Sequence, residues 1–139
     1  MLGKKCIFFQ LAKTNQAAGR FLGHKVAPLN LTPAQAMVLG FLAEEDQVTS
    51  TELGKRTELD SATLTGIIDR LEAAGLIDRM NHPDDRRSIL VCLTNKGKGV
   101  SGERERLVFE ANQEFLAVIT EAEKETLFHI IGKLRQQAQ

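Results

Sequence analysis

Residues 49–75 read TSTELGKRTELDSATLTGIIDRLEAAG, and this stretch decides the fold. Thr49 and Glu52 have the spacing of a capping box, which predicts the start of a short helix that ends near Thr57. Asp60 follows as an N-cap and predicts a second helix directly behind the first. Two short helices joined by a tight turn form a helix-turn-helix, a motif whose second helix enters the major groove of DNA.

The second of these helices is predicted to run from Ser61 to Ala74, and Gly75 is placed to end it. Its aliphatic side chains recur at i, i+3, i+4 and i+7, which gives it one buried face: Leu64, Ile67, Ile68 and Leu71. The other face carries four candidate DNA contacts: Ser61, Thr63, Thr65 and Arg70. Hydroxyl and guanidinium groups bond to bases or phosphates. The alternative is that these side chains only face solvent.

A second stretch, MNHPDDRRSILVCLTNKG at residues 80–97, predicts a hairpin. Strands are expected at about 76–81 and 88–93, because both segments are rich in β-forming residues. Pro83 and Asp84 supply the turn between them. A hairpin that directly follows a helix-turn-helix is a wing, so the whole segment is interpreted as part of a DNA-binding unit.

Two arginines, Arg86 and Arg87, lie at the tip of this hairpin. Arginines there can enter the narrow minor groove, where the negative potential of DNA is strongest. Asp84 or Asp85 is expected to hold an arginine side chain in one pose through a bidentate pair. The alternative is a self-neutralising turn that faces solvent.

Helices are predicted on both sides of this unit. One covers about residues 4–26, and a capping box at Thr32 opens another that runs to about Leu42 and is apolar almost all round, as a central helix would be. A long helix is expected at 95–119, followed by a last one that starts at a capping box at Thr120. The fold class is therefore mainly α, an α+β winged helix.

The composition fits one domain that needs no metal or disulfide. The chain has 139 residues, 42% hydrophobic and 26% charged, and its formal net charge is zero. No apolar run is long enough to span a membrane or to act as a signal peptide, so a cytoplasmic protein without membrane contact is expected. Cys6 and Cys92 suit a reducing compartment. A dedicated nucleic-acid binder is usually more basic.

Enzyme chemistry is not expected. Residues 97–102 match G-x-G-x-x-G, yet no strand is predicted after the helix they open, as a dinucleotide site requires. The three histidines are far apart in sequence, and no nucleophile–base pair is recognisable. The sequence therefore predicts neither an enzyme nor a metal site nor a bound cofactor.

The order of these elements resembles the multiple-antibiotic-resistance-regulator (MarR) family of winged-helix transcription factors. The motifs DRLEAAGLIDR at 69–79 and PDDRRSILVCLTNKG at 83–97 carry the resemblance, which covers essentially the whole chain. It implies a single domain, 1–139, in which 32–93 form the DNA-binding lobe and 1–31 and 94–139 form dimerisation helices. Family members typically are homodimers that bind a palindromic operator and repress transcription.

The resemblance also implies roles for particular residues. The family's Asp-x-Arg pattern in the wing falls on Asp85 and Arg87, and Arg86 would then touch the DNA backbone. His82 departs from the pattern, because the family commonly has aspartate there. Members are often released from DNA by a phenolic or other aromatic ligand, or by an oxidant. Arg20 and His24 are the candidate contacts for an anionic ligand.

Apolar stripes on the first and last helices support a homodimer without the resemblance, because a small winged unit can cover only part of them. Two other interpretations stay open. One is a winged-helix protein-interaction module without DNA binding, which the near-neutral charge favours. The other is a thiol-based redox regulator that uses Cys6, which follows Lys4 and Lys5.

Overall fold

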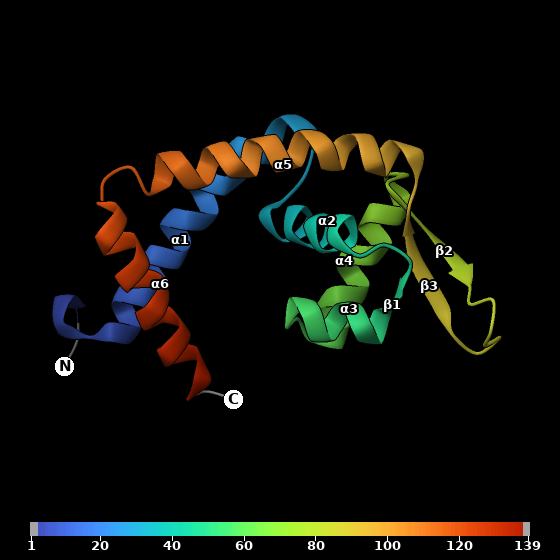
Figure 1. Ribbon diagram of the computed structural model, residues 1–139, viewed down its shortest axis with the longest axis horizontal. Helices are drawn as coiled ribbons and strands as arrows, with labels where there is room; N and C mark the ends of the chain where they lie inside the picture. The colour runs from blue at the N-terminus through green and yellow to red at the C-terminus, as the bar shows by residue number, and fades with distance from the viewer. Residues whose placement is uncertain (1–2, 138–139) are drawn as a thin grey trace.

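The computed structural model describes residues 3–137, which form an arch with two groups of elements below one long helix (Figure 1). The helices are α1 (Ile7–Val26), α2 (Pro33–Glu44), α3 (Ser50–Thr57), α4 (Ser61–Ala73), α5 (Asn95–Phe115) and α6 (Glu121–Gln136), with short 3-10 helices at Gly3–Lys5 and Ala27–Leu29. The strands are β1 (Val48–Thr49), β2 (Ile77–Asn81) and β3 (Ile89–Leu93). The winged-helix fold class is confirmed.

Side-chain caps start most of these helices, as predicted. Thr32, Thr49 and Thr120 form complete capping boxes with the residue three positions later. Asp60 and Thr94 accept a backbone N–H in the same way at the starts of α4 and α5. Each cap satisfies an N–H group that the first helical turn leaves without a partner. Local sequence therefore fixes where the helices begin.

Two helix boundaries differ from the prediction by three residues or more, and one strand was missed. The first helix starts at Ile7 and not at residue 4, because Cys6 has extended backbone angles that separate α1 from the 3-10 helix before it. α5 ends at Phe115 and not at 119, because the chain then turns toward the cap of α6. The strand β1 was not predicted. It has two residues and pairs with β3, so the sheet has three strands in the order β1-β3-β2.

Most of the core lies inside the winged lobe, a name used here for residues 32–93, and Val26 and Leu31 extend it. Five of the twelve residues of α2 are buried, and the predicted stripe of α4 is buried in the same core cluster. By contrast, α6 has no buried residue and α1 has one, Val26. Among the described residues no single helix is long and apolar enough to cross a membrane, although the bent pair Ile7–Leu29 and Pro33–Glu44 has the necessary length and composition.

The junction between the winged lobe and α5 is tightly bonded. The hydroxyl of Thr94 donates to the carbonyl of Gly75 at 2.6 Å, and its backbone N–H donates to Leu76 at 3.1 Å. Gly75 has a left-handed backbone with φ of 76°, as predicted for the residue that ends the recognition helix. Gly97, in the first turn of α5, lies against the carbonyl of Leu76 so closely that a Cβ has no room.

Candidate nucleic-acid interface

The N-terminus of α4 is organised by one carboxylate. Asp60 accepts the backbone N–H of Thr63 at 2.8 Å with one oxygen and the Thr63 hydroxyl at 2.8 Å with the other. The N–H of Thr63, and then its hydroxyl, lower the pKa of Asp60 below its ordinary value. The negative charge of Asp60 is therefore matched by the end of its own helix, which reduces its repulsion of a phosphate nearby.

The predicted contact residues of α4 are all exposed: Ser61, Thr63, Thr65 and Arg70. They lie on the face opposite the buried stripe, and within the described residues Arg70 forms no ion pair. Ser61 and Thr65 also line a hollow of about 350 Å³ between α3 and α4.

Three residues of α3 on the wall of this hollow were not predicted: Ser50, Thr51 and Lys55. Two hydroxyls and an ammonium group around one concave surface are suited to a phosphate of a DNA strand. The capping box could have indicated Ser50 and Thr51 from the sequence. It places both residues in the first turn of α3, where backbone N–H groups point outward.

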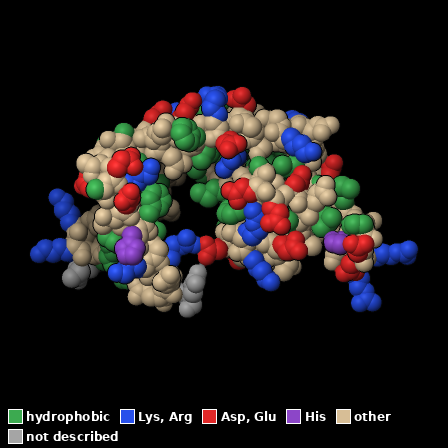
Figure 2. Space-filling view, viewed as in Figure 1, with side chains coloured by type: hydrophobic (Ala, Val, Ile, Leu, Met, Phe, Trp, Pro, Cys, Tyr) green, Lys and Arg blue, Asp and Glu red, His purple; other side chains and the backbone are tan. Residues whose placement is uncertain are grey.

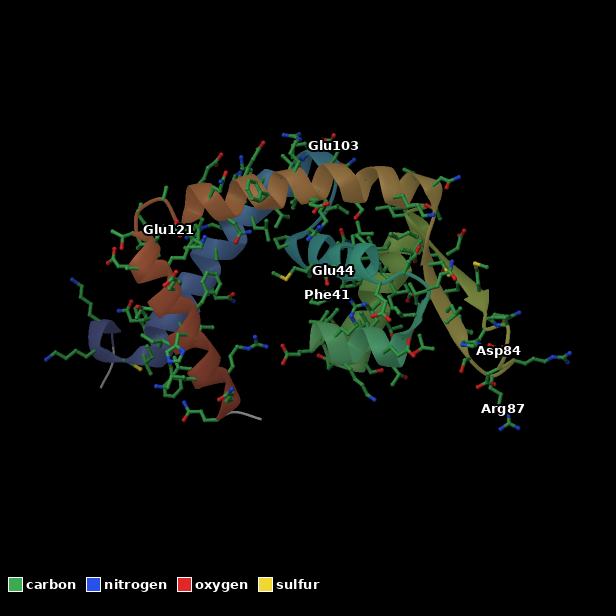
Figure 3. All side chains as sticks on the ribbon, viewed as in Figure 1. Phe41, Glu44, Asp84, Arg87, Glu103 and Glu121 are labelled. Atoms are coloured by element: carbon green, nitrogen blue, oxygen red, sulfur yellow. The ribbon has the colours of Figure 1, made fainter. Side chains whose placement is uncertain are left out.

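The wing is the hairpin of β2 and β3, and hydrogen bonds define its tip. The N–H of His82 donates to the carbonyl of Ser88 at 3.0 Å, and Nδ1 of His82 accepts the N–H of Asp84 at 3.0 Å. The imidazole of His82 thus takes part in the turn at the tip of the wing. Arg86 and Arg87 are exposed, and Arg87 points away from the hairpin (Figure 3).

The expected pair between an aspartate and an arginine side chain at the wing tip is not formed. Asp85 instead accepts the backbone N–H of Arg87 at 2.9 Å and the hydroxyl of Ser88 at 3.1 Å. Backbone N–H groups in a tight turn lie closer to the carboxylate than a flexible guanidinium does. The carboxylate of Asp85 therefore supports the wing by a bond to the backbone of the turn. Within residues 3–137 no acid is paired with Arg86 or Arg87.

A clamp between the wing and α4 was also missed by the sequence analysis. Arg79 on β2 donates to Asp69 at 2.6 Å and to Glu72 at 2.5 Å, and both acids lie on α4. The bond to Asp69 is the main cause that raises the pKa of Arg79 above its ordinary value. The clamp fixes the hairpin against the helix and neutralises two acids that would otherwise weaken the attraction of this lobe for DNA.

The two candidate ligand residues, Arg20 and His24, are exposed and one turn apart on α1. His24 lines a hollow of about 300 Å³ with Phe21, Lys25 and Glu114. A more enclosed apolar cavity of about 220 Å³ lies between α1, α2 and α5, and neither Arg20 nor His24 lines it. Among the residues that the structure describes, the one charged residue on its wall is Arg104, which was not predicted from the sequence.

Arg104 joins α5 to α2. Its Nε donates to the carbonyl of Ala36 at 2.5 Å, and its guanidinium covers the backbone of Gly40, where any larger residue would collide with it. Burial lowers the pKa of Arg104 below its ordinary value. Within the described chain no carboxylate is paired with it. A partly buried cation that lacks an anion is a feature of sites for organic anions.

Comparison with known proteins agrees with this geometry. A family model described as "MarR family" matches residues 29–88. The multiple antibiotic resistance protein MarR of Escherichia coli (strain K12) is 33% identical over 121 residues, which is 86% of this chain and 84% of that protein. This chain belongs to the MarR family.

Solved structures extend the similarity of this MarR-family chain to its three-dimensional form. A mutant of MarR from E. coli complexed with operator DNA matches with a TM-score of 0.84 and 32% identity, over 90% of each chain. A structure that describes regulation of DNA binding of Bordetella bronchiseptica BpsR by 6-hydroxynicotinic acid matches with a TM-score of 0.90 and 25% identity, over 97% of this chain and 96% of that one. The chain is therefore a winged-helix transcriptional regulator, and its homologues are regulators and not enzymes.

The two cysteines of this MarR-family chain have different surroundings. Cys92 is buried on β3, and burial is the main cause that raises the pKa of its thiol, with smaller contributions from Asp46 and Asp78. It is a poor nucleophile at neutral pH for that reason. Cys6 is half-buried at the N-cap of α1, where its side chain makes no capping hydrogen bond.

Proposed function

We propose that the chain is a repressor that binds a palindromic operator as a homodimer and is released from DNA by a small organic anion. The observation that carries the DNA-binding part is the shared surface of α4 and the wing. Arg79 holds these two elements together, while Ser61, Thr65, Arg86 and Arg87 remain exposed on them. In this arrangement α4 enters the major groove, Arg87 enters the minor groove beside it, and Arg86 contacts the DNA backbone.

Exposed apolar side chains on the terminal helices support the homodimer. On α6 they form the predicted stripe of Leu127, Ile130, Ile131 and Leu134, each at least 38% exposed, and on α1 they include Ile7, Phe8, Phe9 and Leu11. A second copy would cover both stripes around a two-fold axis and place two α4 helices about 34 Å apart, one turn of DNA. Residues 1–31 and 94–139 would then form the dimerisation part and 32–93 the DNA-binding part.

The first prediction concerns the wing. In selection of duplexes from a random library, we expect the purified protein to enrich a palindrome, and we expect its affinity to fall steeply as salt rises. Arg87→Ala should weaken binding about tenfold and reduce the salt slope by about one. The clamp residue Arg79 is left intact in this variant, so the fold of the lobe is unaffected.

Two outcomes would contradict this proposal. A dimer that enriches no duplex would favour the protein-interaction module, whose near-neutral charge is the observation in its favour. An Arg87→Ala protein with wild-type affinity and slope would remove the wing from the interface. Loss of DNA binding on peroxide treatment that is absent in Cys6→Ser would instead favour the redox regulator.

The second prediction concerns release from DNA. Arg104 lies in an apolar cavity between α1, α2 and α5, so an aromatic carboxylate can place its ring in the cavity and its anion against the guanidinium. The relative BpsR, whose DNA binding is regulated by an aromatic carboxylate, supports this class of effector. An anion that draws Arg104 away from the carbonyl of Ala36 would loosen α5 from α2 and shift the winged lobe.

Titration of 6-hydroxynicotinate and related aromatic carboxylates against the DNA complex tests this mechanism. We expect at least one of them to dissociate the wild-type complex, and Arg104→Gln to need about tenfold more of it, because the charge-assisted bond is lost. The double variant Arg20→Ala and His24→Ala is the matched control for the other basic candidates on α1. If the control loses the response and Arg104→Gln keeps it, the effector binds at the surface of α1 and not in the cavity.

A further inference from the structure

One ion pair connects the far end of α6 to the winged lobe. Arg135, in the last turn of α6, bonds to the carboxylate of Glu58, in the turn between α3 and α4. Figure 2 shows an open hollow between the terminal helices and the winged lobe. The two residues are 77 positions apart in sequence. The C-terminal end of α6, which carries Arg135, lies on the side of the arch opposite α5 (Figure 1).

Local sequence rules do not account for a glutamate at position 58. Glu58 is the C-cap of α3 and has a left-handed backbone with φ of 58°, a conformation that favours glycine or asparagine. A carboxylate at the C-terminal end of a helix is also repelled by the helix dipole. The ion pair with Arg135 is a contact that Glu58 makes outside its own segment.

We propose that Arg135 is a positioning residue that sets the distance between the two recognition helices of the dimer. The inference rests on the proposed function, in which α6 belongs to the dimerisation part. Glu58 lies two residues before Asp60, the cap of α4, so a restraint on Glu58 acts directly on the end of α4 that faces DNA. Arg135 therefore limits how far each winged lobe moves relative to α6, and with it the spacing of operator half-sites that the dimer accepts.

The expected effect is moderate, because the side chains of Arg135 and Glu58 are 61% and 50% exposed, and an exposed ion pair is weak. The pair biases the position of the lobe and does not lock it. The measured quantity should therefore be a ratio of affinities for duplexes that differ only in half-site spacing. Phosphate contacts are common to all these duplexes and cancel in the ratio.

The experiment starts from the duplex that wild-type protein enriches and adds or removes one base pair between its half-sites. We expect Arg135→Gln and Glu58→Gln each to reduce the preference for the native spacing about threefold. The charge swap that combines Glu58→Arg with Arg135→Glu should restore it. The matched control is Arg106→Gln, because Arg106 is also an exposed arginine with two acidic partners, Glu103 and Glu110, but all three lie on α5.

A second readout needs no DNA. With Cys6→Ser and Cys92→Ala removing the native thiols, a spin label at Lys55→Cys on each α3 reports the distance between the two lobes of a dimer. Arg135→Gln should widen that distance distribution. If Arg135→Gln and Glu58→Gln match wild type in both readouts, the inference is wrong. If wild type enriches no duplex, the proposed function fails, and the claim about half-site spacing fails with it.

Discussion

Gly97→Ala is expected to lower the free energy of unfolding by about 3 kcal/mol or more, which corresponds to a fall in Tm of about 10 °C. The Cβ of an alanine at this position would meet the carbonyl oxygen and carbon of Leu76, which belong to the backbone and cannot rotate away. Relief of the clash requires α5 to separate from the start of β2, and the hydrogen bonds that Thr94 makes to Gly75 and Leu76 would be lost as well.

The matched control for this variant is Gly99→Ala, two residues further along α5. Nothing lies within 4 Å of a Cβ at Gly99, so the substitution replaces a flexible helical residue by the best helix former. It should raise the free energy of unfolding by about 0.5–1 kcal/mol. Thermal unfolding of both variants measures the difference. Equal stabilities would mean that the junction between the winged lobe and α5 is looser than the structure shows.

Ile130→Glu is expected to dissociate the dimer. Ile130 is 47% exposed in the single chain, so a glutamate is tolerated there before association. In the proposed dimer the same carboxylate would be buried in an apolar interface without a partner. A penalty of about 3 kcal/mol raises the dissociation constant of the dimer by about 100-fold, which sedimentation equilibrium can measure.

The affinity of the Ile130→Glu protein for DNA should fall when the dimer dissociates, because a single winged lobe contacts only one half-site. His129→Glu is the control, since it adds the same charge to α6 on the face away from the apolar stripe. It should leave the dimer intact. An Ile130→Glu protein that remains a dimer would place the interface elsewhere, and the exposed stripe of α6 would then need another explanation.

The features that sequence alone predicted are those that depend on neighbours a few residues apart. Caps such as Asp60, the stripe of α4 and the left-handed Gly75 each follow from spacing within one or two turns. The hairpin and its exposed arginines follow from turn residues and β-formers in the same short segment. These local signals were enough for the fold class and for the face that carries the candidate DNA contacts.

The features that sequence alone did not predict depend on contacts between distant segments. The strand β1 has two residues and exists because β3 offers it partners. The bond from Arg104 to the carbonyl of Ala36 joins residues 68 positions apart, and no spacing rule indicates it. The partner of Asp85 was predicted wrongly for another reason, because several donors lie near its carboxylate. The backbone N–H of Arg87 donates to Asp85, and the arginine side chains do not.

The clamp of Arg79 on Asp69 and Glu72 has a consequence for how an operator would be read. Because two bonds one helical turn apart connect β2 to α4, they favour movement of the wing together with the helix. In the proposed complex, base preferences in the major groove and in the adjacent minor groove would then be coupled. A second base-pair change in one half-site would then cost less binding free energy than the first. The sum of two single-change penalties would overestimate the loss of binding free energy that a double change causes.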